Sequence, residues 1–133
     1  MHQPDFAAIT SAVPFAGHLG FEVIRCDAEE VIVEVTLAPE HCTAGGTAHG
    51  GFLMALADFT GAAGGFVTLP AGARGTTTIE SKTNMIGAAP AGSRLRAIAT
   101  PLHIGRRTSV WNTRVETADG KLISQTSQTQ FVL

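Results

Sequence analysis

The sequence predicts an α+β domain in which an antiparallel sheet wraps around one long central helix. Two segments with strand character precede a stretch of helical periodicity at residues 50–67, and four more segments with strand character follow it. The connections in the second half are short enough for hairpins, which join antiparallel neighbours. We therefore expect the helix to pack against the sheet that these strands form.

Length and composition indicate one domain that hides much of its surface. The chain has 133 residues, within the range of about 100–200 that is usual for a single domain. Only 15% of the residues are charged, against about 25% in typical proteins. The net charge of −2 gives no overall basic field that would attract nucleic acid. We expect a single domain over residues 1–133 with part of its surface covered by another subunit.

The sequence predicts a soluble, cytoplasmic protein. The first five residues lack the basic and apolar regions of a signal peptide. The longest uncharged stretch, residues 42–57, is rich in Gly, Thr and Ala and is too polar to span a membrane. The two cysteines, Cys26 and Cys42, do not make a disulfide framework.

The first part of the chain is expected to contain a short helix and a hairpin. Residues 1–14 form an N-terminal helical segment, with the helix itself at residues 5–12. β-Branched residues dominate Phe21–Cys26 and Val31–Leu37, and the polar residues between these two segments predict a hairpin turn.

The central helix is predicted by apolar residues that recur every three or four positions from Gly50 to about Val67. These residues are Phe52, Leu56, Phe59, Ala63 and Phe66. The opposite face is apolar too, so we expect this helix to be buried nearly all round; it carries Met54, Ala55 and Ala62. Three glycines are expected to allow close packing against the sheet: Gly61, Gly64 and Gly65.

Four strands are predicted after the helix by alternating segments rich in Thr, Val and Ile. They are Thr76–Met85, Leu95–Ile104, Ser109–Thr117 and Leu122–Leu133. The sequence Ala118-Asp-Gly-Lys between the last two is typical of a tight hairpin turn.

Asp58 is the first candidate for chemistry, because it is the only charged residue between Glu40 and Arg74. An isolated carboxylate on an apolar helix is costly to ionise unless it has partners. A catalytic base or nucleophile in a cleft explains such a residue. The alternatives are a structural pairing with a core hydroxyl and a position that faces a solvent gap.

The residues His49-Gly50-Gly51 open the central helix and are the second candidate. Backbone N–H groups at a helix start lack intrahelical partners and carry the positive end of the helix dipole. Such donors suit a developing oxyanion, although a tight turn would also explain the two glycines. His49 could be a ligand, a donor or a helix cap.

Other catalytic motifs do not fit. Gly45 and Gly50 have the spacing of a P-loop, but Gly51-Phe52 follows where Lys and Ser or Thr are needed. No Gly-x-Ser-x-Gly sequence is present. His41, Cys42 and His49 lack the paired short spacings of a zinc site, so we expect no metal and no other cofactor.

His49-Gly-Gly with an Asp nine residues on, preceded by Gly46, resembles the PaaI-like hotdog-fold acyl-CoA thioesterases. The resemblance covers roughly residues 15–133. It extends to Ser81-Lys-Thr-Asn-Met, Pro90-Ala-Gly, His103-Ile-Gly-Arg-Arg-Thr-Ser-Val-Trp-Asn and Asp119-Gly-Lys-Leu-Ile. The family has the hotdog fold, in which a sheet wraps around a central helix, so the resemblance agrees with the predicted order of elements.

The resemblance implies roles for single residues. Asp58 matches the catalytic carboxylate, Gly50 the backbone N–H that polarises the thioester carbonyl, and His49 the histidine beside it. Thr78 lies near a hydroxyl residue that positions water in relatives. Relatives often carry an active-site Asn six residues before this histidine, where the present chain has Thr43.

Further residues are expected to contact the substrate. Gly51 is a candidate at the helix start. Five apolar side chains could line an acyl pocket: Phe52, Met54, Phe59, Phe66 and Met85. Arg106 and Arg107 are the only adjacent arginines, and two guanidinium groups at a turn can hold phosphates. The resemblance places basic residues of this region near the CoA nucleotide.

The sequence therefore predicts a thioesterase that hydrolyses an acyl-CoA to a carboxylate and free CoA. Alternatives are an acyl-thioester hydratase or dehydratase, and a hotdog protein that binds acyl-CoA without catalysis. We expect a homodimer or a dimer of dimers whose active sites are shared between chains, because Gly50 and Asp58 are too far apart on one helix to act on one carbonyl.

Overall fold

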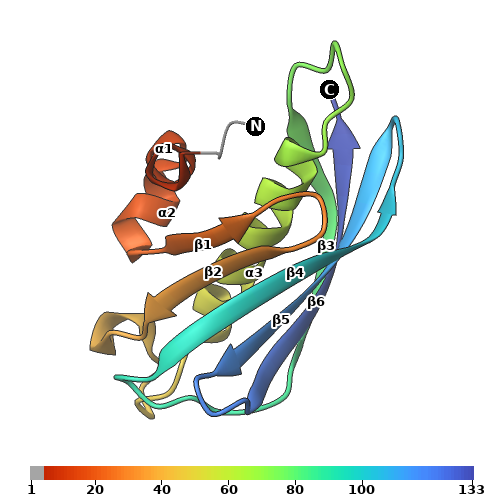
Figure 1. Ribbon diagram of the computed structural model, residues 1–133. Helices are drawn as coiled ribbons and strands as arrows, with labels where there is room; N and C mark the ends of the chain where they lie inside the picture. The colour runs from red at the N-terminus through yellow and green to blue at the C-terminus, as the bar shows by residue number, and fades with distance from the viewer. Residues whose placement is uncertain (1–4) are drawn as a thin grey trace.

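The structure is a computed structural model that describes residues 5–133. One antiparallel sheet of six strands curves around the helix α3 (Figure 1). The helical segments are α1 (Phe6–Ala12), α2 (Pro14–Leu19), the 3-10 turn η1 (Pro39–His41) and α3 (Gly50–Val67). The strands are β1 (Glu22–Cys26), β2 (Val31–Thr36), β3 (Thr76–Met85), β4 (Arg94–Ile104), β5 (Thr108–Thr117) and β6 (Leu122–Val132). The predicted α+β class and the order of elements are confirmed.

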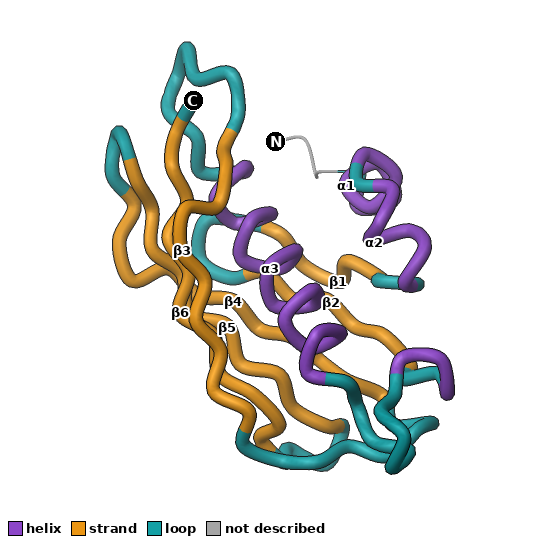
Figure 2. The backbone as a smooth tube through the Cα atoms, turned by 180° about the vertical axis from the view of Figure 1, so that it is seen from behind, coloured by secondary structure: helices purple, strands orange, loops and turns teal. Residues whose placement is uncertain are grey.

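The strand order β1-β2-β4-β5-β6-β3 places β3 at one edge of the sheet. The chain leaves α3, enters β3 and pairs it with β6, so the other side of β3 has no neighbouring strand among the described residues. Seen from behind, α3 lies against one face of the sheet, while α1 and α2 lie near β1 at the opposite edge (Figure 2). Strand β3 is therefore a free edge beside the central helix.

The core lies between α3 and the inner face of the sheet. Alternate residues of β2, β4 and β5 point toward the helix and are buried: Val31, Val33, Val35, Leu95, Ala97, Ala99, Trp111 and Val115. The side of α3 that meets them contributes Phe52, Leu53, Leu56 and Phe59. This alternation is the period-2 pattern that the sequence shows.

The N-terminal segment differs from the prediction. The expected helix is α1, with Asp5 as its cap, accepting from the Ala8 N–H at 3.1 Å. Pro14 does not close a helical region but begins a second helix, α2, where its missing N–H costs nothing. Val13 between the two helices is extended, as expected for a residue before proline. The part of the prediction on residues 1–4 lies outside the described residues.

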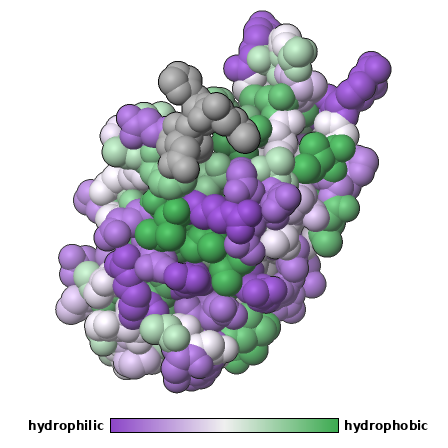
Figure 3. All heavy atoms as spheres, in the orientation of Figure 1, coloured by the Kyte–Doolittle hydropathy of each residue, from purple (hydrophilic) through white to green (hydrophobic). Residues whose placement is uncertain are grey.

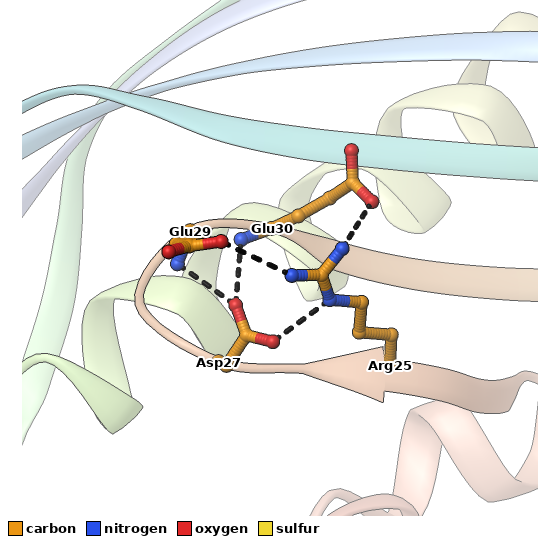
Figure 4. Close-up of polar contacts among 4 residues, drawn as sticks. All are labelled: Arg25, Asp27, Glu29 and Glu30. Carbon is orange, nitrogen blue, oxygen red and sulfur yellow. Dashed lines mark hydrogen bonds and ion pairs between the residues drawn. The ribbon is translucent and has the colours of Figure 1, made fainter.

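The hairpin between β1 and β2 is held by a cluster of charged side chains (Figure 4). Arg25 lies 2.8 Å from the Asp27 carboxylate and 3.0 Å from that of Glu30. The other oxygen of Asp27 accepts from the backbone N–H groups of Glu29 and Glu30. The hydrogen bond from Arg25 and those from the backbone hold the pKa of Asp27 below its ordinary value.

The glycines of α3 let it approach the sheet closely, as predicted. A Cβ on Gly64 would lie 2.6 Å from Cζ3 of Trp111, and one on Gly65 would lie 2.8 Å from Cγ of Gln130. A Cβ on Gly61 would collide with the amide of Gln128. The glycines lower the intrinsic helix propensity at these positions, but they allow the helix to contact β5 and β6 closely.

The prediction that α3 is buried nearly all round is wrong. One stripe of the helix is open, with Met54 45% and Phe66 60% exposed, and Gly51 is exposed on the same side. Among the described helices, α3 is long and apolar enough to cross a membrane by length and composition, a test that core helices of soluble proteins also pass. Here it packs on the sheet with one apolar stripe uncovered.

We expect Gly64→Ala to lower the free energy of unfolding by about 1–3 kcal/mol, because its Cβ would collide with a fully buried indole ring. Gly17→Ala on α2 is the control, since no atom outside its chain neighbours and the backbone of its own helix lies within 4 Å of its Cβ position. That variant gains helix propensity and should be up to about 1 kcal/mol more stable. Urea unfolding of both variants measures the difference, and equal effects would contradict the close-packing role.

Candidate active site

Asp58 lies in the middle of α3 on its open stripe and is half-buried. Its oxygen Oδ1 lies 3.1 Å from the hydroxyl of Thr78 on β3 and 3.2 Å from the side-chain nitrogen of Gln128 on β6. The structure thus brings together two residues that the sequence singled out, Asp58 and Thr78. The carboxylate has polar partners, which offset the cost of its position on an apolar helix.

A chain of side-chain hydrogen bonds continues from this carboxylate along the inner face of the sheet. The amide oxygen of Gln130 lies 2.6 Å from the Thr78 hydroxyl and 2.8 Å from the amide nitrogen of Gln128. The Gln130 nitrogen in turn donates to the hydroxyl of Thr76 at 3.1 Å. The Thr78 proton is shared between two acceptors, Asp58 and Gln130.

Sequence reasoning missed Gln128 and Gln130. Both are buried at 1% exposure, on a face of β6 where apolar residues are usual. The available signal was the unbroken run of polar residues from Ser124 to Gln130, which puts polar side chains on both faces of β6, including the buried face toward the helix. Four buried polar residues in register on one strand indicate a polar network rather than a plain core.

The start of α3 is capped by His49. Its ring nitrogen Nδ1 accepts from the Gly51 N–H at 2.8 Å, so of the three sequence alternatives for His49 the structure gives the helix cap. The Gly51 N–H is therefore occupied, whereas the Gly50 N–H donates to no acceptor among residues 5–133. Met85 lies beside Gly50, with Cε 3.2 Å from the place a Cβ would occupy.

Other predicted site residues are not brought to the carboxylate within one chain. Gly50 is eight residues from Asp58 on the same helix, about 12 Å along its axis. Thr43 makes its contacts within its own loop, where its hydroxyl accepts from the Gly45 N–H at 3.3 Å. Arg106 and Arg107 lie exposed at the turn between β4 and β5.

Two pockets flank the open stripe of α3. One, of about 230 Å³, lies at the first half of the helix and includes His49, Gly51 and Phe52 in its lining. The other, of about 290 Å³, lies between α1 and the second half of α3; it is mainly apolar and is lined by Ile9, Ala12, Val13, Phe59, Ala62, Ala63, Phe66, Val67 and Thr76. Of the apolar candidates from the sequence, Phe52 lines the first pocket, and Phe59 and Phe66 the second.

No three His, Cys, Asp or Glu side chains within residues 5–133 come close enough together to hold a metal ion. His41 and His49 both serve as hydrogen-bond acceptors for nearby backbone N–H groups, since Nδ1 of His41 accepts from Ala38 at 3.0 Å. Burial raises the pKa of the Cys26 thiol to about 11, so this thiol remains protonated near neutral pH.

Comparison with known proteins identifies the family. The sequence profile of the thioesterase superfamily matches residues 45–124, which include His49, Gly50, Asp58 and Thr78. A mutant form of the phenylacetic acid degradation protein PaaI from Thermus thermophilus is 31% identical, with a TM-score of 0.82 over 90% of this chain and 99% of that one. A Haemophilus influenzae protein provisionally named an esterase is 32% identical over 79% of this chain and 75% of its own.

A more distant structure shares the fold. The crystal structure of a Streptococcus pneumoniae protein described as a hypothetical thioesterase, solved with coenzyme A, is 21% identical. It has a TM-score of 0.73 over 86% of each chain. The chain described here belongs to the thioesterase superfamily, as a PaaI-like member with the hotdog fold. It is a thioesterase, and the enzyme class and fold predicted from the sequence are confirmed.

Proposed function

We propose that this thioesterase hydrolyses an acyl-CoA to a carboxylate and free CoA, with Asp58 as general base or nucleophile. The observation that carries the proposal is the Asp58 carboxylate itself, half-buried on the open stripe of α3 and anchored by Thr78 and Gln128. The coenzyme A held by the Streptococcus pneumoniae protein supports CoA as the thiol part of the substrate.

Two routes lead from this carboxylate to the same products. As a general base, Asp58 accepts a proton from water while the water oxygen attacks the thioester carbon, and the C–S bond breaks to release CoA. As a nucleophile, Asp58 attacks the carbon, forming a mixed anhydride with loss of CoA, and water then releases the acid. Both routes place negative charge on the carbonyl oxygen, where the Gly50 N–H acts as the donor.

Each active site is built from two chains. An oxyanion donor must lie about 3 Å from the carbonyl oxygen, and the base or nucleophile must be similarly close to its proton or carbon. Gly50 and Asp58 of one helix, about 12 Å apart, do not meet both demands. In a twofold dimer with antiparallel α3 helices, Gly50 of one chain lies beside Asp58 of the other, twice.

The exposed apolar surface supports this dimer. Strand β3 is a free edge of the sheet, and such edges pair readily with another strand. Ile79 on β3 is 58% exposed, and Met54 and Phe66 are exposed on the neighbouring stripe of α3. Apolar residues also reach the surface among polar ones on the face drawn in Figure 3. Pairing of two β3 strands would cover this edge and bring the two helices side by side.

The acyl group is medium-chain or aromatic. The apolar pocket beside the second half of α3 includes Ala62, one helical turn after Asp58, and Thr76 at the end of the hydrogen-bond chain from Asp58. Its volume of about 290 Å³ is larger than the roughly 150 Å³ of a dry cavity that accepts benzene. The Thermus thermophilus relative, named for phenylacetic acid degradation, supports an aromatic acyl group.

The test of this function is release of free thiol from a panel of acyl-CoAs that runs from acetyl through medium-chain and arylacetyl to long-chain groups. We expect turnover that is highest for medium-chain or arylacetyl groups. With a 2-enoyl-CoA and a 3-hydroxyacyl-CoA included in the panel, a change in double-bond absorbance without thiol release would instead indicate a hydratase or dehydratase. Saturable binding without either signal would indicate a protein that only binds acyl-CoA, and both outcomes would contradict the proposal.

We expect Arg106→Ala and Arg107→Ala to raise KM for acyl-CoA more than they lower kcat. Both arginines are exposed and form no ion pair with a carboxylate among the described residues, so their guanidinium groups are free for the nucleotide phosphates. Contacts to that remote end are equal in the ground and transition states. An acyl-pantetheine substrate, which lacks the nucleotide, should show a smaller effect. An equal penalty on both substrates would contradict the phosphate role.

A further inference from the structure

Gln128 lies under the middle of α3 and points its amide nitrogen at Asp58. That nitrogen is 3.1 Å from the main-chain oxygen of Asp58 and 3.2 Å from Oδ1 of its carboxylate. One amide group therefore contacts both the backbone and the side chain of the same residue. Such a double contact restricts rotation of the carboxylate about its side-chain bonds, which a single contact to the carboxylate would not do as strongly.

The two side-chain hydrogen bonds that the Asp58 carboxylate accepts both end on the same oxygen. Thr78 and Gln128 both approach Oδ1, whereas Oδ2 accepts no hydrogen bond from the described residues. Oδ1 is thus held by the protein, and Oδ2 is the oxygen available to water or to a thioester carbon. The arrangement distinguishes two oxygens that are chemically equivalent in a free carboxylate.

The orientation of the Gln128 amide is fixed by its neighbours. Its nitrogen also lies 2.8 Å from the side-chain oxygen of Gln130, which is an acceptor. Because the nitrogen faces acceptors on Asp58 and on Gln130, the amide oxygen must point the other way, toward Gly61 on α3. Gln130 therefore sets the orientation in which Gln128 donates to the carboxylate.

Holding the amide in this orientation is unfavourable for the fold. The side-chain oxygen of Gln128 is buried and has no hydrogen-bond partner among the described residues, which destabilises a folded protein. The helix also carries a glycine at position 61, where a Cβ would lie 2.9 Å from the amide carbon Cδ. An apolar side chain at position 128 and an alanine at position 61 would both suit the core better. Local rules are broken in this way mainly at functional sites.

We propose that Gln128 is a positioning residue that anchors Oδ1 of Asp58 and so presents Oδ2 to the reacting centre. The proposal rests on the proposed function of Asp58. Gln128 does not touch the substrate, so it acts on the chemical step through the carboxylate. Removing its nitrogen should lower kcat and leave KM nearly unchanged.

Gln128→Met tests the proposal, because methionine has a similar length and no donor. We expect kcat for the best acyl-CoA to fall about 10- to 100-fold, since misplacement of a reacting group by about 1 Å can have effects of this size. KM should change less than about twofold, and Tm should be unchanged or higher, because the unpartnered buried oxygen is gone. A residue with only a structural role would show the opposite pattern, a lower Tm with kcat intact.

Gln125→Met is the matched control, because Gln125 is on the same strand but on the outer face, where its amide donates to Asn112. It should leave kcat and KM unchanged. Gln128→Asn is the second variant: it keeps a buried amide but is one methylene too short to reach Asp58, and the same loss of kcat is expected. If Gln128→Met does not fold, the kcat of Gln128→Asn tests the proposal.

The possible outcomes separate this inference from the proposed function. A wild-type protein without turnover on the whole acyl-CoA panel would overturn the proposed function and this inference with it. An active wild type with unchanged kcat in Gln128→Met or Gln128→Asn would overturn the inference alone. A loss of kcat that Gln125→Met shows equally would also overturn it.

Discussion

Asp58→Asn is expected to lower kcat by at least about 100-fold, the lower end for the loss of a general base. The asparagine oxygen can still accept from Thr78 and Gln128, so the geometry at Oδ1 is kept. The substitution replaces Oδ2 by an amide nitrogen. This nitrogen can neither accept a proton from water nor attack the thioester carbon. Thiol release with the best acyl-CoA from the panel measures the loss, and circular dichroism confirms that the fold is intact.

Asp119→Asn is the control for this experiment. Asp119 is exposed in the turn between β5 and β6, where its carboxylate accepts from the Thr117 hydroxyl and contacts no residue of the site, so its loss should leave kcat unchanged. An Asp58→Asn protein with near-wild-type kcat and a normal spectrum would rule out the catalytic role. If that protein were also more stable, Asp58 would be a strained structural residue instead.

Gly50→Pro is expected to lower kcat by about 100- to 1,000-fold, because it removes the N–H that faces the developing oxyanion. The substitution suits the backbone: Gly50 is the first residue of α3, where proline is common. His49 before it is already extended, with φ −67° and ψ 137°, as a residue preceding proline requires. The Cβ that it adds meets only the flexible end of Met85.

Gly50→Ala is the matched control, because it adds the same Cβ against Met85 but keeps the N–H. It should retain most of the wild-type kcat. Equal losses of kcat in the proline and alanine variants would show that Gly50 is needed because a larger residue does not fit beside Met85. The N–H donor would then not be the reason. A Gly50→Pro variant with full activity would remove this N–H from the mechanism.

The fold was largely predictable because its elements carry clear periodic patterns. The spacing of Phe52, Leu56 and Phe59 predicts α3 with the bounds that it has, and alternation predicts β3 to β6 to within one residue at each end. The second N-terminal helix was missed because Pro14 is compatible with both the end and the start of a helix. The exposure of Met54 and Phe66 was missed because an apolar residue looks the same in the sequence whether the fold or a partner covers it.

The candidate site was predictable only in part. Asp58 stands out because no other charge lies near it in the sequence, and the family resemblance led to Thr78, which does contact it. Gln128 and Gln130 were not found because their partners lie on other elements, about 50 to 70 residues away in the chain. Such contacts depend on the register of β6 beside β3, which local patterns do not specify.

The shared active site is the central claim, and mixing two inactive variants tests it most directly. Asp58→Asn and Gly50→Pro proteins are unfolded together, refolded and separated from aggregates, and mass spectrometry measures the fraction of mixed dimers. A mixed dimer holds one site with both defects and one site with an intact Asp58 and an intact Gly50. We expect each mixed dimer to regain about half of the wild-type kcat, while each variant refolded alone stays inactive. Mixed dimers that form and remain inactive would contradict the shared site.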